Sequence, residues 1–91
     1  MSSETKLNAE QICFSGAQRI RGFLYHDESC YLSKDASGLY FVFEFTMRDR
    51  DGVREIGRFS VLGALIEDGI VSEQSLHAAL WQELGRLRGM V

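Results

Sequence analysis

Arginine is concentrated in one short part of this sequence. Eight of the ten basic residues are arginine, and four of these lie close together, at Arg48, Arg50, Arg54 and Arg58. The planar guanidinium group binds carboxylates and phosphates through paired hydrogen bonds. The cluster is therefore the first candidate for a site that binds an anion or an acidic partner. Acidic residues are interleaved with these arginines, so cross-strand ion pairs are the alternative that we favour.

A second group of polar side chains lies at His26, Asp27 and Glu28, directly before Ser29 and Cys30. Histidine and carboxylate groups can transfer protons, and a thiolate is a nucleophile. A small enzyme that uses His26 and Cys30 is therefore one hypothesis. The sequence has no glycine-rich phosphate loop and no nucleophile elbow, and a polar turn of this kind is typical of a solvated loop. We expect no catalytic residues and no enzymatic activity.

Candidate metal ligands are few and scattered. Three residues separate His26 from Cys30, and Cys13 and His77 are the only distant candidates. No Cys-x-x-Cys or His-x-x-x-His pattern accompanies them, so the sequence predicts neither a metal site nor a cofactor. Two cysteines make no disulfide framework, and we expect free, partly buried thiols.

Two residues near the C-terminus have no clear place in a core. Leucines recur at helical spacing after Ser72, whereas His77 and Trp81 lie off this apolar stripe. Tryptophan is enriched at protein interfaces, where its apolar body is buried and its N–H finds a partner. Both residues are therefore candidate binding residues. The alternative for Trp81 is that it packs over the sheet edge as part of the core.

The clearest element that could hold these groups is a strand over residues 39–47. Every odd position in it is apolar, while the even positions change from apolar to polar. One face should therefore lie on the core, and the other should become solvated toward the end of the strand. Asp51-Gly52 then predicts a tight turn into a second strand over 53–59. Together these strands form a predicted central hairpin over 39–60.

Two registers fit this hairpin. A two-residue turn would pair Met47 with Ile56. A three-residue loop with a glycine bulge would instead pair Phe43 with Phe59. The sequence does not choose between them.

The chain is predicted to end on two helices. After Ser60 the apolar period changes from two to between three and four, which indicates a short helix that stops at Gly69. Ser72 is a good N-cap for a second helix that extends to about Met90. Val71, before the cap, is placed to staple this helix to the core.

The first third of the chain has weaker patterns. Short apolar stretches at 12–14, 20–26 and 30–32 predict further strands, and residues 1–10 form a flexible tail. Residues 11–91 then form a single α+β domain. Its small antiparallel sheet has four to five strands, and the two C-terminal helices pack on one of its faces.

The composition restricts the classes of function. The formal net charge of −3 disfavours a nucleic-acid binder, although binding of nucleic acid or nucleotide through the arginine-bearing hairpin is the alternative. No apolar stretch is long enough to span a membrane and no export signal is present, so we expect a cytoplasmic protein. By elimination we expect a small, non-enzymatic interaction or regulatory protein. Its partner would be another protein or a second copy of the chain, giving a homo-oligomer.

Overall fold

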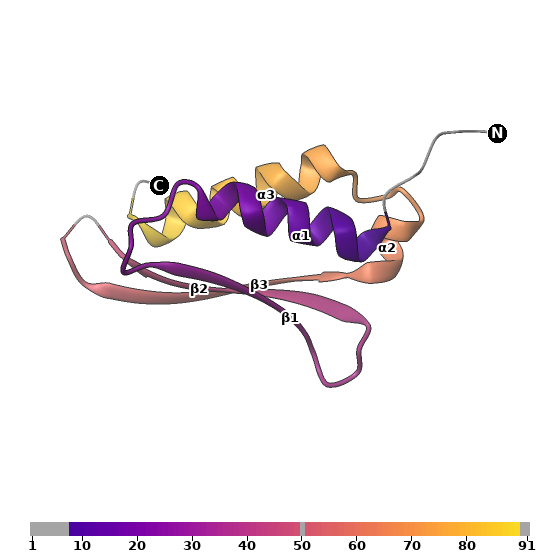
Figure 1. Cartoon of the computed structure of the whole chain (residues 1–91), viewed down its shortest axis with the longest axis horizontal. Helices are drawn as coiled ribbons and strands as arrows, with labels where there is room; N and C mark the ends of the chain where they lie inside the picture. The colour runs from indigo at the N-terminus through magenta and orange to yellow at the C-terminus, as the bar shows by residue number, and fades with distance from the viewer. Residues whose placement is uncertain (1–7, 50, 90–91) are drawn as a thin grey trace.

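The computed structural model describes residues 8–49 and 51–89. The helices are α1 (Ala9–Arg21), α2 (Gly63–Glu67) and α3 (Glu73–Leu87). The strands are β1 (Ser29–Lys34), β2 (Tyr40–Arg48) and β3 (Arg54–Leu62). They form one antiparallel sheet in the order β1-β2-β3, and α1 and α3 lie side by side on one of its faces (Figure 1). The α+β class with an antiparallel sheet is confirmed, but the helices that lie side by side on its face are α1 and α3, not the two C-terminal helices that the sequence predicts.

Helix α1 corrects the prediction for the first third of the chain. Residues 12–14 and 20–26 are predicted to be strands, whereas the helix covers Ala9–Arg21 and residues 22–28 form the turns that lead into β1. The sheet therefore has three strands in the described residues, not four to five, and the third helix of the fold is N-terminal. Ala9 and Glu10, at the end of the predicted tail, belong to this helix, and residues 1–7 lie outside the described residues.

The buried face of α1 is made mostly of small residues. A prediction based on the spacing of large apolar side chains therefore does not find this helix. The buried face of α1 consists of five residues on one side of the helix: Ala9, Cys13, Gly16, Ala17 and Ile20. A Cβ atom on Gly16 would lie only 3.0 Å from Leu80 Cδ1, so the glycine allows α1 and α3 to approach closely. Asn8 and Gln11 close the helix start with a reciprocal capping box. Packing against α3 therefore decides this helix.

The hairpin adopts the register of the three-residue loop. Phe43 lies opposite Phe59, and their ring centroids are 6.0 Å apart. Gly52 supplies the positive φ of 83° that closes the loop, and the Asp49 carboxylate accepts hydrogen bonds from the backbone N–H groups of Asp51 and Val53. β2 is the central strand, as its pattern predicts.

The core lies between the sheet and the helix layer. The odd residues of β2 are buried there, namely Phe41, Phe43, Phe45 and Met47. α3 buries four leucines against them, namely Leu76, Leu80, Leu84 and Leu87. Gly57 of β3 is essential to this contact, because a Cβ atom there would lie 2.5 Å from Leu87 Cδ1. α3 therefore packs directly over β3, and α1 packs mainly over β1.

The two C-terminal helices are found as α2 and α3. Ser72 caps α3 by accepting a hydrogen bond from Ser75 N, and Ser75 Oγ accepts one from Ser72 N in return. Val71 packs against the core beside this cap, as a hydrophobic staple does. Within residues 8–49 and 51–89, no helix has the length and apolar content to cross a membrane.

The contact between Gly57 and Leu87 predicts opposite effects for two glycine substitutions. Gly57→Val should lower the free energy of unfolding by about 1–3 kcal/mol, because Leu87 must leave its place over β3. Gly85→Ala is the matched control: it lies in α3 with open space around its Cα, and it should raise that free energy by about 0.5–1 kcal/mol. Urea titrations followed by circular dichroism measure both. An unchanged midpoint for Gly57→Val would show that α3 does not pack on β3 in this way.

Candidate functional site

The side of the sheet that faces away from α1 and α3, here called the outer face, has no helix or strand over it in the described part of the chain (Figure 1). Successive side chains of a strand alternate between the two faces, so the register assigns its residues. They are Ser29, Tyr31 and Ser33 of β1, Tyr40, Val42, Glu44, Thr46 and Arg48 of β2, and Arg54, Ile56, Arg58, Ser60 and Leu62 of β3.

Three large side chains of the outer face meet solvent. Tyr31, Tyr40 and Ile56 are 63%, 41% and 75% exposed, one from each strand. Val42 lies between the serines of the neighbouring strands and is nevertheless buried. Aromatic and aliphatic groups exposed together on an open sheet are the chemistry of a docking surface.

One ion pair lies in the middle of the outer face. Arg58 Nη1 is 3.5 Å from Glu44 Oε2, and the two residues are direct cross-strand neighbours. Both side chains are largely exposed, so the pair adds little to stability and either group can exchange its partner.

The other hairpin arginines do not converge with Arg58. Arg48 lies opposite Arg54 in the register, but its guanidinium turns toward Asp27 and donates through Nε to Oδ2 at 2.7 Å. This hydrogen bond holds the pKa of the Asp27 carboxyl below its usual value. Arg54 has no ion pair with any residue that the structure describes, and Arg50 lies outside the described residues. Among the described residues, the cross-strand ion pairing favoured from the sequence therefore holds only Arg58, because Arg48 pairs with an acid outside the hairpin.

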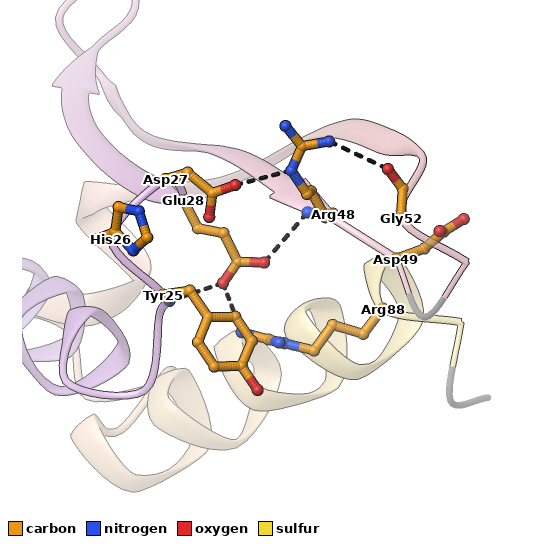
Figure 2. A pocket seen from close by; sticks show the side chains of 8 residues that line it. All are labelled: Tyr25, His26, Asp27, Glu28, Arg48, Asp49, Gly52 and Arg88. Atoms are coloured by element: carbon orange, nitrogen blue, oxygen red, sulfur yellow. Dashed lines mark hydrogen bonds and ion pairs between the residues drawn. The ribbon is translucent and has the colours of Figure 1, made fainter.

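A pocket of about 560 Å³ lies where the hairpin meets the end of α3 (Figure 2). Eight residues line it: Tyr25, His26, Asp27, Glu28, Arg48, Asp49, Gly52 and Arg88. The predicted polar turn at residues 26–28 forms one wall, and β2 with its loop forms another. Its two arginines are already bound to carboxylates, and the guanidinium of Arg88 also stacks on the Tyr25 ring at 5.0 Å.

Glu28 is the buried acid at the base of this pocket. Its side chain is 1% exposed, and its two oxygens accept hydrogen bonds from Tyr25 N, Arg48 N and Arg88 Nη2 at 2.8–3.1 Å. These donors come from the loop after α1, from β2 and from the end of α3. Glu28 therefore ties together three segments that are far apart in the sequence, and its hydrogen bonds explain its burial without a catalytic role.

The two candidates on α3 have structural contacts. Trp81 packs edge-to-face against Phe23 with ring centroids 4.5 Å apart, which closes the seam between α3 and the segment after α1. His77 lies over Gly16, and its Nδ1 is 3.0 Å from Arg19 Nη1. Since arginine can only donate, Nδ1 must accept, and the neutral ring carries its proton on Nε2. That buried nitrogen has no partner among the described residues.

The thiols lie in the core, and their pKa values are raised. Burial raises the pKa of Cys13 to about 12 and that of Cys30 to about 11, although Arg21 lowers the latter slightly. Both cysteines are free. Across residues 8–49 and 51–89, no group of three or more His, Cys, Asp or Glu side chains is placed to hold a metal ion.

The sequence interpretation found the arginines but not the outer-face residues Tyr31, Tyr40 and Ile56. The apolar even positions early in β2 predict a second face that is covered at its start. A more specific signal is that every strand carries at least one large apolar residue of this parity. Comparisons with protein-family models, with curated proteins and with solved structures found no match.

The Glu28 interaction predicts a large effect from a nearly isosteric change. Glu28→Gln should lower the free energy of unfolding by about 2–4 kcal/mol, because it leaves the largely buried Arg88 guanidinium without a counter-charge. Glu44→Gln makes the same chemical change in an exposed pair and should cost less than about 0.5 kcal/mol. Equal losses for the two variants in urea unfolding would contradict the assigned role of Glu28.

The contacts of His77 predict a loss of stability in mild acid. Its pKa is lowered by burial and by the Arg19 charge, with Glu73 acting in the opposite direction. The unfolded chain therefore takes up a proton near pH 6.5 that folded His77 resists, so stability should fall as the pH drops from about 7.5 to about 5.5. His77→Asn keeps an acceptor for Arg19 and should flatten this slope. A His77→Asn slope equal to that of the wild type would refute the assignment.

Proposed function

We propose that this chain is a small, cytoplasmic protein-interaction module without a catalytic role, and that it self-associates through the outer face of its sheet. The observation that carries the proposal is the uncovered outer face with Tyr31, Tyr40 and Ile56 exposed on it. Two sheets that bury such faces against each other pack about 10 Å apart and interdigitate these side chains.

The central ion pair supports a two-fold arrangement. An axis that runs along the strands between β2 and β3 brings Glu44 of one chain over Arg58 of the second, and the reverse contact follows by symmetry. The same axis brings Ile56 over the second chain's Thr46. The face is thus complementary to itself in charge.

The absence of catalysis is supported by the state of the candidate groups. The thiols of Cys13 and Cys30 are buried and stay protonated at neutral pH because of their raised pKa values, so neither is an activated nucleophile. Free cysteines in a domain of this size are also typical of a reducing compartment. An enzyme using His26 and Cys30 stays the third hypothesis.

Nucleic-acid or nucleotide binding through the hairpin stays the alternative prediction. It draws on Arg54 and Arg58, which share the outer face with two exposed tyrosines that could stack on bases. The pairing of Arg48 with Asp27 and of Arg58 with Glu44 reduces the positive charge available to phosphates. We therefore favour a protein partner.

Sedimentation velocity at high micromolar concentration tests self-association. The wild-type chain should sediment as a dimer, and Ile56→Lys should weaken dimerisation by at least about tenfold, because it inserts a cation between Arg54 and Arg58 at the contact. Ile70→Lys is a matched control, since Ile70 is 71% exposed but lies in the turn before α3, away from the sheet. A monomeric wild type, or equal losses in the two variants, would overturn the proposal.

A further inference from the structure

The backbone of β3 has unpaired hydrogen-bonding groups along its free edge. Asp49 N donates to Val53 O at one end of the β2–β3 pair, and Gly63 N donates to Leu39 O at the other. In an antiparallel ladder, pairs of residues that are hydrogen-bonded to each other alternate with pairs that are not. Val53 and Gly63 belong to hydrogen-bonded pairs, so the odd residues of β3 between them also bond to β2. The N–H and C=O groups of its even residues therefore point away from the sheet at Arg54, Ile56, Arg58 and Ser60, whereas Leu62 is already the N-cap of α2.

The opposite edge of the sheet is protected. β1 has six residues against nine in β3, and Arg21 Nε donates to the outward carbonyl of Cys30 at 3.0 Å. Among the described residues, no hydrogen bond reaches the outward backbone groups of β3. Exposed edges of this length are templates for another strand.

Antiparallel pairing of β3 with the β3 of a second copy is disfavoured by the helix layer. Leu87 packs directly on Gly57, so α3 lies over β3 itself. A two-fold axis normal to the sheet would bring the two α3 helices to about 5 Å, the spacing of strands, whereas packed helices need about 8–10 Å. An extended segment without a helix over it avoids this clash in either strand orientation.

The charges beside the edge define the chemistry of that strand. On the outer face, β3 presents Arg54, Ile56 and Arg58 in succession. Directly opposite cross-strand neighbours are stabilised by opposite charge or by apolar contact. An added strand is therefore matched when it carries acidic, apolar and acidic residues at alternate positions. This pattern reads the same in both directions, so it holds for either strand orientation.

We propose that the free edge of β3 binds an extended acidic segment of another protein as a fourth strand of the sheet. Backbone hydrogen bonds supply the affinity, and Arg54 and Arg58 select the sequence. The inference rests on the proposed function of protein interaction. The added strand pairs with the backbone edge of β3, whereas the dimer buries the outer face, and the side chains of Arg54, Ile56 and Arg58 lie beside both.

A labelled peptide, Thr-Thr-Glu-Thr-Val-Thr-Glu-Thr-Thr, tests the proposal by fluorescence anisotropy. It should bind at least about tenfold more tightly than the same peptide with lysine for glutamate. The double variant Arg54→Glu/Arg58→Glu should reverse this preference. Equal binding of the two peptides, or an unchanged preference in the double variant, would overturn the charge assignment and with it the proposal.

Backbone pairing has its own readout. In the free chain, amide hydrogens of Ile56, Arg58 and Ser60 should exchange faster than those of Gly57 and Phe59, and the acidic peptide should slow them. Protection of the same amides by raised protein concentration alone would instead identify a second copy at the edge and overturn the proposal.

A pair of proline variants localises the binding site. Ser60→Pro removes an outward N–H and no bond to β2, so peptide binding should weaken about tenfold or more while the fold is kept. Lys34→Pro removes the equivalent outward N–H of β1 and should bind the peptide normally, because Asp35 N pairs inward with Tyr40 O. Normal peptide binding by Ser60→Pro would exclude the β3 edge.

Sedimentation of the same samples separates this inference from the outer-face dimer. A dimer that ignores the acidic peptide overturns the edge inference and keeps the proposed self-association. A monomer that binds the peptide overturns self-association and keeps the edge inference.

Discussion

A sheet has two faces, and this chain places its helices on only one of them. The three strands are about as wide as two packed helices, so α1 and α3 cover most of the inner face, and the short α2 adds Ile66 to the core. The close contacts at Gly16 and Gly57 are what make this layer fit, because each lets a helix approach without an intervening side chain. The uncovered outer face and the free β3 edge both follow from this constraint.

Glu28 holds this arrangement at one end. Burying a carboxylate lowers the stability of the fold unless its oxygens accept hydrogen bonds and its charge is paired. The Glu28 oxygens accept hydrogen bonds from two backbone N–H groups and from one guanidinium group, which also supplies the opposite charge. The neighbouring pocket therefore looks like a site by its composition, with histidine, carboxylates and arginines together. Its charged groups are nevertheless committed to joining the α1–β1 loop, the hairpin and the end of α3. We assign it a structural role.

The outer face and the β3 edge are proposed to bind different partners. The outer face is complementary to itself, because Glu44 and Arg58 can exchange partners across a two-fold axis. At the edge, antiparallel pairing of two β3 strands would bring the α3 helices too close, and Arg54 and Arg58 favour the acidic strand that we propose. The two surfaces share the side chains of β3, so we expect occupation of one to influence the other.

Local patterns were sufficient for the parts of the chain in which neighbours in sequence are neighbours in space. The alternation in β2, the Asp51-Gly52 turn and the Ser72 cap determine the central hairpin and α3 from the sequence by itself. Tertiary structure alone decided α1, since a stripe of alanine, cysteine and glycine becomes a buried face only when α3 packs against it. It also decided the hairpin register and the separation of the arginines, because Arg48 finds Asp27 and Arg88 finds Glu28 across more than twenty residues of chain. Such partners are set by the packing of whole elements, which no short window of sequence contains.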